Sequence, residues 1–250
     1  MRHLSSVGFL IPAQIKSAWL RLCDPNGRQF LCPLCGYFGP FQCAGTDKER
    51  HHAACPRCGS LERHRLLWLT FQSLARERDL SAMRVLHFAP ERCLKSRLSR
   101  MFGRYETADF SARNVDHQVD MCNLPFPDGS FDVVVACHVL HHIRDEAGAI
   151  NGLRRILRVG GFAIIPVPVF SDTTVEYSEP IDTQMRAPGR DYFNRCRRAF
   201  SLVQIYCSGD FDPLYQVWAY EDRRQWPPHL SQRPPCPGEK HEEYIPVCFR

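Results

Sequence analysis

Short apolar runs alternate with amphipathic stretches between residues 84 and 167. The runs are rich in branched and aromatic residues, as is typical of buried strands, and the stretches between them have the spacing of helices. The predicted strands are residues 84–88, 105–109, 115–121, 131–136 and 162–167, and the predicted helices are residues 92–101 and 146–157. Strands that alternate with helices form parallel sheets with right-handed crossovers, so this region predicts an α/β fold.

A long helix is predicted directly before this region. Residues 61–80 contain neither Gly nor Pro, and their leucines recur together with Trp68 and Phe71. Ser60 is the expected N-terminal cap, because its hydroxyl can accept a hydrogen bond from a free N–H group of the first turn. This helix joins the α/β region to the segment before it.

Two copies of the pattern C-P-x-C-G lie in that segment, at residues 32–36 and 55–59. Proline presets a tight turn, and glycine takes a conformation that is costly for other residues. The spacing between the pairs is typical of zinc sites. We predict a structural Zn²⁺ site whose ligands are Cys32, Cys35, Cys55 and Cys58. Four cysteine ligands leave no open position for catalysis, and Cys43, His51 and His52 are expected not to be ligands.

The positive charge is concentrated near the N-terminus. The chain has 250 residues and a net charge of +5; residues 1–80 hold 11 Lys and Arg against 6 Asp and Glu, and the remainder holds 21 of each. The basic residues are 28 Arg and only 4 Lys, which is typical either of a nucleic-acid binder or of a biased genome. Four thiolates on one Zn²⁺ add −2, which lowers the charge of the N-terminal part to about +3.

No apolar run approaches the roughly 18–20 residues that cross a bilayer. The apolar patch at residues 7–11 is too short for a secretory leader. We therefore expect a cytoplasmic protein without a membrane span, whose 13 cysteines stay reduced.

A cluster of basic residues follows the second knuckle. Arg57, Arg63, His64 and Arg65 lie close together in the sequence. They are either a phosphate-binding patch or a solvated face, and the sequence leaves both interpretations open.

Ligands of parallel sheets bind beyond the carboxyl ends of the strands. The residues expected there include Asp109, about 20 residues beyond the first strand, where a carboxylate can accept both hydroxyls of a ribose. The first turn reads His-Phe-Ala-Pro-Glu at residues 87–91 and lacks the glycines that bring backbone close to a pyrophosphate. This turn disfavours NAD, FAD and ATP but not S-adenosylmethionine (SAM), which carries no phosphate.

Several motifs together resemble class I SAM-dependent methyltransferases of the type 11 group. They are D-M-C-N-L-P-F at 120–126, D-G-S-F-D at 128–132, H-V-L-H-H at 138–142 and R-I-L-R-V-G-G at 155–161. The double knuckle, C-G-S-L-E-R-H-R at 58–65 and V-L-H-F-A-P-E at 85–91 resemble a bacterial subgroup of that fold. The resemblance covers roughly residues 30–220.

The resemblance implies a Rossmann-like doubly wound sheet, mostly parallel with an antiparallel last strand, together with a small N-terminal zinc ribbon. A helix at 189–199 and strands at 200–208 and 213–220 fit the end of such a sheet. The expected organisation is an N-terminal extension (1–29), the ribbon (30–60), the connecting helix (61–80), the methyltransferase domain (81–222) and an extended, poorly packed Pro-rich tail (223–250).

The resemblance also implies a SAM site. Its expected residues are Phe88, Ala89, Pro90, Glu91, Asp109, Phe110, Asp120, Met121, Cys137 and His138. The turn at 88–91 lies under the methionine moiety, Asp109 holds the ribose, Asp120 and Met121 flank the adenine, and Cys137 and His138 lie near the sulfonium. Two positions depart from the pattern: Ala89-Pro90-Glu91 replaces the glycine-rich turn, and His141 replaces the usual acid.

Methyl transfer is an in-line displacement, so the enzyme mainly aligns nucleophile, methyl and sulfur. A base is needed only where the acceptor proton has a high pKa, and His138 and His142 are the predicted candidates. At a spacing of four residues they share one face of a helix, if that segment is helical. Glu176 and Tyr177, in the loop after the fifth strand, are expected at the acceptor pocket by analogy of fold.

Three functions remain open. The first is a SAM-dependent methyltransferase acting on a small molecule, a glycan or a lipid-linked acceptor. The second is an RNA or protein methyltransferase that docks its substrate through the basic ribbon. The third is a non-catalytic binding protein that keeps the fold. Residues 137–140 read Cys-His-Val-Leu, which disfavours enzymes that methylate the exocyclic amines of nucleic-acid bases.

Overall fold

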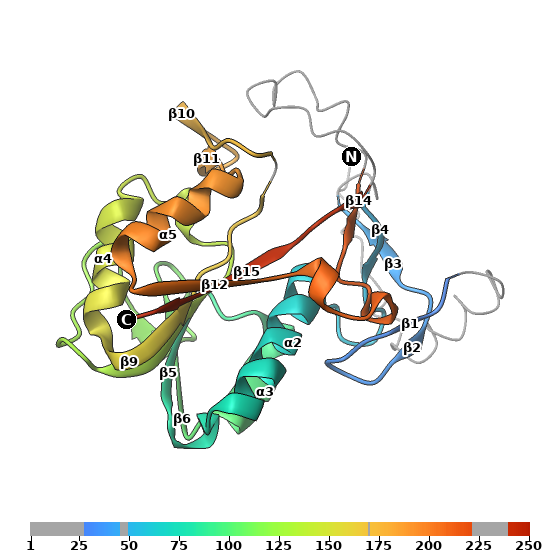
Figure 1. Ribbon diagram of the computed structural model, residues 1–250, viewed down its shortest axis with the longest axis horizontal. Helices are drawn as coiled ribbons and strands as arrows, with labels where there is room; N and C mark the ends of the chain where they lie inside the picture. Colours follow the sequence, from blue (N-terminus) through green and yellow to red (C-terminus); the bar gives the residue numbers. More distant parts are fainter. Residues whose placement is uncertain (1–27, 46–49, 170, 222–239) are drawn as a thin grey trace, which may run out of the picture.

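A seven-stranded sheet forms the centre of the computed structural model, which describes residues 28–45, 50–169, 171–221 and 240–250 (Figure 1). The strands in spatial order are β12 (Leu202–Cys207), β15 (Tyr244–Phe249), β9 (Leu157–Ile164), β8 (Phe131–Ala136), β5 (Arg84–Phe88), β6 (Arg104–Asp109) and β7 (His117–Gln118). The strand β15 is antiparallel to both of its neighbours, and the other pairs are parallel. The predicted sheet, mostly parallel with one antiparallel strand, is confirmed.

Helices cover both faces of this sheet (Figure 1). They are α2 (Glu62–Glu77) and α3 (Arg92–Met101) on one face, and α4 (Glu146–Ile156) and α5 (Phe193–Ala199) on the other. Successive strand residues point to opposite faces. Val133 and Val135 therefore pack in the cluster of α2 and α3, whereas Val134 packs in that of α4 and α5.

Most predicted elements of the parallel half lie close to their observed bounds, but the strand predicted at 115–121 is only His117–Gln118, and the strand predicted at 162–167 spans Leu157–Ile164. The helix at 92–101 and the strands at 84–88 and 131–136 have the bounds that the sequence predicts. The connecting helix is shorter than expected: it ends at Glu77, and a 3-10 helix follows at Leu80–Ala82. Its cap is Leu61 and not Ser60, because the Ser60 hydroxyl lies against the thiols of the knuckles, 3.2 Å from Cys58 Sγ.

The C-terminal part corrects two expectations. Residues 213–220 do not pair with β12; the antiparallel partner of β12 is β15, at the end of the chain. The expected tail at 223–250 is therefore not a poorly packed segment throughout, because residues 244–249 lie inside the sheet, with Ile245 and Val247 fully buried. Much of the Pro-rich stretch, with Cys236, lies outside the described residues.

The ribbon is completed by a distant part of the chain. Its strands are β1 (Phe30–Leu31), β2 (Phe38–Gly39), β3 (Gln42–Ala44) and β4 (Arg50–Ala54), and β4 pairs with β13 (Ala219–Tyr220), which pairs with β14 (Lys240–His241). The strands β13 and β14, which lie between β12 and β15 in the chain, thus extend the sheet of the ribbon (Figure 1). A further hairpin, β10 (Val175–Ile181) and β11 (Gln184–Ala187), follows β9.

Arg65 joins the ribbon, α2 and the C-terminal segment. Its side chain is fully buried, and its guanidinium donates to the carbonyls of Ala53, Ser60, Tyr215 and Gln216 at 2.5–3.1 Å. It also stacks over Phe41, 4.6 Å from the ring centroid. The interpretation of Arg65 as part of an exposed basic cluster is therefore wrong, because five donors in a fixed fork suit converging backbone carbonyls.

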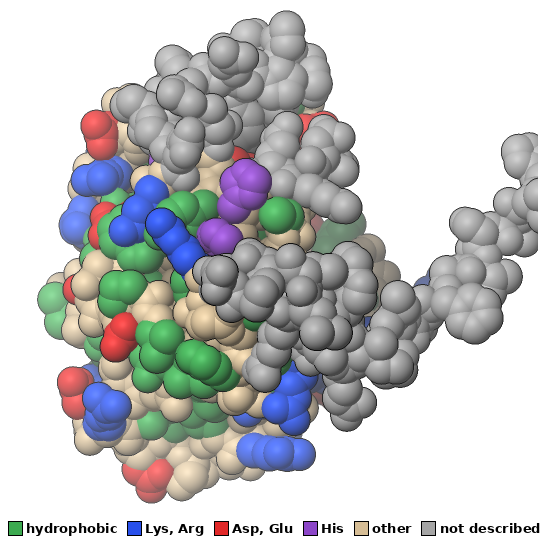
Figure 2. Space-filling model, turned by 90° about the vertical axis from the view of Figure 1, so that its right-hand side faces the viewer, with side chains coloured by type: hydrophobic (Ala, Val, Ile, Leu, Met, Phe, Trp, Pro, Cys, Tyr) green, Lys and Arg blue, Asp and Glu red, His purple; other side chains and the backbone are tan. Residues whose placement is uncertain are grey.

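The surface carries charges of both signs. On the face that Figure 2 shows, Lys and Arg side chains lie among acidic and hydrophobic ones. Among the described residues, the most exposed large apolar side chains are Val159, at 89%, and Phe110, at 72%. Among the described residues, no helix combines the length and the apolar character needed to cross a bilayer.

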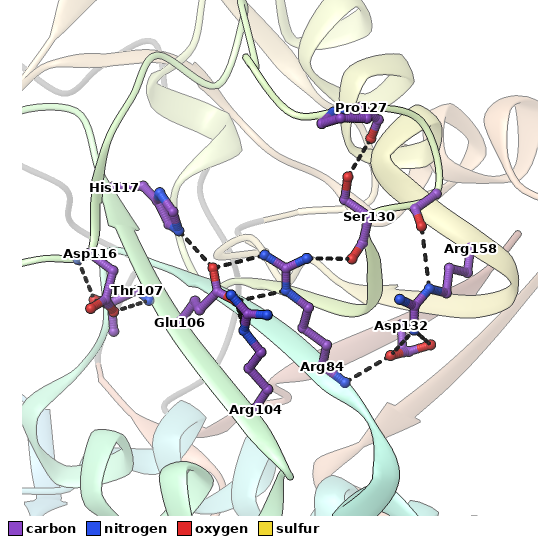
Figure 3. Close-up of polar contacts among 11 residues, drawn as sticks. Arg84, Arg104, Glu106, Thr107, Asp116, His117, Pro127, Ser130, Asp132 and Arg158 are labelled. Carbon is purple, nitrogen blue, oxygen red and sulfur yellow. Dashed lines mark hydrogen bonds and ion pairs between the residues drawn. The ribbon is translucent and has the colours of Figure 1, made fainter.

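A polar network ties together the strands at the amino edge of the sheet (Figure 3). Glu106 accepts hydrogen bonds from Arg84 at 2.6 Å and contacts His117 at 2.7 Å. Arg104 forms an ion pair with the same carboxylate at 2.6 Å. The bond from Arg84, with that from His117, lowers the pKa of Glu106 to about 2 against the opposite effect of burial. One oxygen of this carboxylate is thus bonded to Arg84 of β5, and the other is bonded to Arg84 and to His117 of β7.

Candidate functional site

A cavity of about 320 Å³ opens at the carboxyl ends of β5, β6 and β8. It is lined by Phe88, Ala89, Asp109, Phe110, Val119, Asp120, Met121, His138, Val139, His142 and Ile143. The structure therefore brings together seven of the ten residues predicted for SAM, and both predicted catalytic histidines. Pro90, Glu91 and Cys137 are not in its wall. Parallel sheets bind ligands at this edge.

Asp109 and Asp120 are held at the cavity by bonds to their own loops. Asp109 Oδ1 accepts from the backbone N–H groups of Ser111 and Ala112, both at 2.8 Å. Partial burial alone would raise the pKa of Asp109, but the N–H bonds lower it below its ordinary value, so the carboxylate is ionised. Asp120 Oδ1 likewise accepts from Cys122 N–H at 2.9 Å. Two oriented acceptors thus lie on one side of the cavity.

Two non-glycine residues in the cavity wall have left-handed backbones. Ala89 has φ +46° and His138 has φ +57°. Their N–H groups donate to Ala108 O and Pro166 O, both at 2.8 Å, which fixes the two turns. Ala89 thus takes, without glycine, the conformation for which the glycine of a phosphate-binding turn is usually needed, at a cost of about 1–2 kcal/mol.

The two candidate catalytic histidines do not share a helix face. The backbone at His138 is left-handed, and the next residues, Leu140–His142, form a 3-10 helix. The expectation of a common helical face was therefore wrong. Burial, followed by the positive charge of Arg63, lowers the pKa of His138 well below its ordinary value, so its ring is neutral. His142 Nδ1 lies 3.0 Å from Thr183 Oγ1.

Glu176 and Tyr177 lie on β10 and not in a loop. Glu176 is engaged by Arg186 at 3.0 Å and by Arg195 at 2.5 Å, and Tyr177 is buried. Neither lines the cavity. Their assignment to an acceptor pocket remains a prediction.

Glu91 belongs to a buried chain of polar contacts beside the cavity. His87 Nε2 lies 2.9 Å from Glu91 Oε2, and His87 Nδ1 lies 2.8 Å from the Tyr105 hydroxyl. Burial, followed by the negative charge of Glu91, raises the pKa of the Cys137 thiol well above its ordinary value. On the other side of Glu91 lies His64 of α2, at 3.9 Å. His64 was considered only as part of a basic cluster, because its contact with Glu91 depends on packing that no local pattern encodes.

The four predicted zinc ligands meet at one point. Their sulfur atoms, from Cys32, Cys35, Cys55 and Cys58, all lie within 4.8 Å of one another. Each knuckle is closed by an N–H bond from its glycine to its first cysteine, and Gly36 and Gly59 have φ +70° and +72°. Four converging sulfurs fit Zn²⁺ in tetrahedral coordination. Cys43 lies outside this group, 3.6 Å from His51 at the exposed side of the ribbon.

The family described as "Methyltransferase domain" matches residues 87–165, which contain the end of β5, the whole of β6, β7, β8 and β9, and all the residues of the cavity wall. This match covers about a third of the chain. The match ends well before the C-terminal segment and begins after the ribbon and α2, so those parts of the protein lie outside the matched domain.

Known relatives resemble this domain over short stretches. The chain is 35% identical over 88 residues to 27-O-demethylrifamycin SV methyltransferase of Amycolatopsis mediterranei, which covers 33% of this chain and 32% of that protein. It is 43% identical over 63 residues to the ubiquinone/menaquinone biosynthesis C-methyltransferase UbiE of Xanthomonas oryzae pv. oryzae, which covers 24% of each. The chain thus spans about a third or less of the length of these relatives.

The solved structures that resemble this chain include a SAM-dependent methyltransferase from Archaeoglobus fulgidus. Its TM-score is 0.46 at 12% identity, and the superposition covers 74% of this chain and 94% of that one.

Proposed function

We propose that this protein is a SAM-dependent methyltransferase. The observation that carries the proposal is the cavity at the carboxyl edge of the matched domain, with Asp109 and Asp120 on one side and His138 on the other. Asp109 would accept the ribose hydroxyls, and Asp120 would accept from the adenine amino group. His138, in its neutral form, would stand near the sulfonium. SAM supplies the electrophilic methyl group, and the chain aligns the acceptor with it.

The acceptor that we favour is a small molecule, a glycan or a lipid-linked compound. The alternative, an RNA or protein substrate, requires a basic docking surface on the ribbon. Support for such a surface is weak. Arg65, one of the basic residues beside the second knuckle, is buried and bonded to backbone carbonyls. Arg57 also donates to Cys35 O at 3.1 Å. Arg65 is therefore not available to bind a phosphate at this position.

Calorimetry with SAM tests the cofactor assignment. The wild type should bind SAM, and Asp109→Ala should bind it at least about tenfold more weakly, because a charged hydrogen-bond acceptor contributes about 1.5–3 kcal/mol. Asp128→Ala is the matched control, since this exposed aspartate lies at the opposite edge of the sheet and pairs with Arg155. Absence of SAM binding by the wild type would contradict both enzymatic functions and favour the non-catalytic one.

Labelled SAM identifies the acceptor class. Cell fractions divided into RNA, protein, lipid and small molecules should show label in the small-molecule or lipid fraction. If RNA is labelled instead, and if the labelling falls steeply as salt rises, then the ribbon is a docking module for nucleic acid.

We also propose that the four cysteines hold a structural Zn²⁺. The support is their donor set and their spacing, which leave no open coordination position. Metal analysis of Cys32→Ser and Cys58→Ser should show loss of the zinc present in the wild type, with Cys43→Ser as the control. Full zinc retention in both variants would refute the four-cysteine site.

A further inference from the structure

A second cavity lies between the helices α4 and α5, which pack against the same face of the sheet (Figure 1). Its volume is about 380 Å³, against about 320 Å³ for the cavity at the carboxyl edge. The two cavities have no lining residue in common. We call the second one the interhelical groove, and its walls include Glu146, Ala147, Ile150 and Asn151 of α4 and Arg195 and Arg198 of α5.

A network of ion pairs forms one wall of the interhelical groove. Glu146 is only 4% exposed, and it pairs with Arg186 at 3.0 Å and with Arg195. Both arginines also pair with Glu176, Arg186 at 3.0 Å and Arg195 at 2.5 Å. Two positive and two negative charges therefore balance within this wall. The carboxylate of Glu146 is compensated by its own partners, so it does not exclude an anion from the groove.

Arg198 lies outside this balanced network. Its side chain is exposed at the groove, and it forms no ion pair or hydrogen bond with any described residue. Burial, followed by the positive charge of Arg198, lowers the pKa of Arg195, so the two guanidinium groups lie close together. Like charges three residues apart on a helix repel each other, and an anion beside them offsets this repulsion. The fork of a guanidinium also fits two oxygens of a carboxylate or a phosphate.

The remaining lining suits the apolar part of a ligand. Ile150 is only 2% exposed, and it presents hydrocarbon between the two helices. Ala147 and Ala199 are small, which leaves the space above them open. The amide of Asn151, which is exposed, adds one neutral donor and acceptor. The groove thus combines one uncompensated cation with an apolar floor.

We propose that the interhelical groove binds a small organic anion, a phosphate ester or a carboxylate, whose charged group lies on Arg198 beside Arg195. Its apolar part lies on Ile150 and the two alanines. The local charge agrees with this ligand class, because residues 190–199 contain four arginines and a single acid, Asp191. The site is independent of the proposed function, since no residue of the SAM cavity takes part in it.

The groove lies directly behind the wall of the SAM cavity. Arg186, which pairs with Glu146 in the groove, also donates to the carbonyl of Ile143 at 2.7 Å, and Ile143 lines the SAM cavity. One buried guanidinium therefore connects the two cavities. The bound anion and SAM occupy separate sites on either side of it.

Calorimetry with phenyl phosphate tests the site, because this probe carries both an anionic group and an apolar ring. The wild type should bind it at least about tenfold more tightly than inorganic phosphate, which lacks the ring, or benzyl alcohol, which lacks the charge. Arg198→Gln should weaken phenyl phosphate by about tenfold or more, the range for one charged hydrogen bond. Ala147→Phe fills the groove without a change of charge and should cause a similar loss.

Arg197→Gln is the matched control, because it removes the same charge from the next position, where the side chain is exposed and bonds to Asn194 at 2.9 Å. It should bind phenyl phosphate within about twofold of the wild type. All three variants should keep the Tm of the wild type, since each changed side chain is exposed. A wild type that does not bind phenyl phosphate, an equal loss in Arg197→Gln and Arg198→Gln, or full affinity in Ala147→Phe would overturn the proposal.

Discussion

The two edges of the central sheet carry polar networks that differ in one respect. At the amino edge, Glu106 is bonded through both oxygens to Arg84, His117 and Arg104 (Figure 3). At the carboxyl edge, Glu91 is bonded through one oxygen to His87, and its other oxygen faces His64 across 3.9 Å. Both carboxylates have a pKa lowered to about 2.

The number of bonded oxygens distinguishes a carboxylate that stabilises the fold, Glu106, from one that can bind a ligand, Glu91. A buried carboxylate with all its partners supplied by the protein holds the fold together. A buried carboxylate oxygen without a partner among the described residues can instead accept a hydrogen bond from a ligand. A lowered pKa alone does not distinguish the two, because ion pairs that serve only the structure also lower it.

The largest effect is expected at Arg65, where every nitrogen of the guanidinium donates to a backbone carbonyl of the protein. Arg65→Met should lower the free energy of unfolding by about 3–5 kcal/mol, because it removes a buried cation and leaves the carbonyls of Ser60 and Gln216 without their donor. Urea denaturation measures this loss, with Arg76→Met, an exposed position on the same helix, as the control. A loss below about 1 kcal/mol would show that the bonded network at the junction contributes little.

A smaller effect is expected at Glu106. Glu106→Gln should lower the free energy of unfolding by about 1–3 kcal/mol at pH 7, because the amide cannot accept charged hydrogen bonds as strongly. The pKa of Glu106 is lowered in the folded state, from an ordinary value of 4.5 to about 2. Its contribution is therefore present above pH 4.5 and is lost as the pH falls toward 2.

Denaturation of the wild type and Glu106→Gln between pH 7 and pH 3 tests this dependence. The difference between them should shrink as the pH falls through this window. A difference that stays constant with pH would mean that the charge of Glu106 is not what stabilises the edge.

The smallest effect is expected at Ala89. Ala89→Gly relieves a left-handed backbone, worth about 1–2 kcal/mol, but glycine loses about 0.5–1 kcal/mol more entropy on folding. We therefore expect a net stabilisation of about 1 kcal/mol or less, seen as a small rise in Tm. A clear destabilisation would show that the left-handed turn is not strained.

The parallel half of the fold was largely predictable from the sequence. Strand 131–136 and helix 92–101 depend on neighbours close in the chain, and their apolar spacing encodes them. The arrangement of the C-terminal segment was not predictable. The strand β15 is inserted between β9 and β12, and β13 pairs with β4 across more than 160 residues. A short apolar strand carries no signal that names such a distant partner.

The site follows the same rule. Asp109, Asp120 and His138 were placed at the cavity edge because each follows a strand, and the structure brings them together. The pair of Glu91 and His64 was not predicted, because it depends on how α2 packs against the turn after β5. The common helical face of His138 and His142 was also wrong, because a left-handed backbone at His138 leaves no trace in the residue types.

A side-by-side titration of Glu91→Gln and Glu106→Gln with SAM tests the comparison of the two edges most directly. Both substitutions remove one buried charge and keep the size of the side chain. We predict that Glu91→Gln binds SAM at least about tenfold more weakly than the wild type, and that Glu106→Gln binds it within about twofold. Equal affinities for the two variants, or a larger loss in Glu106→Gln, would contradict the account.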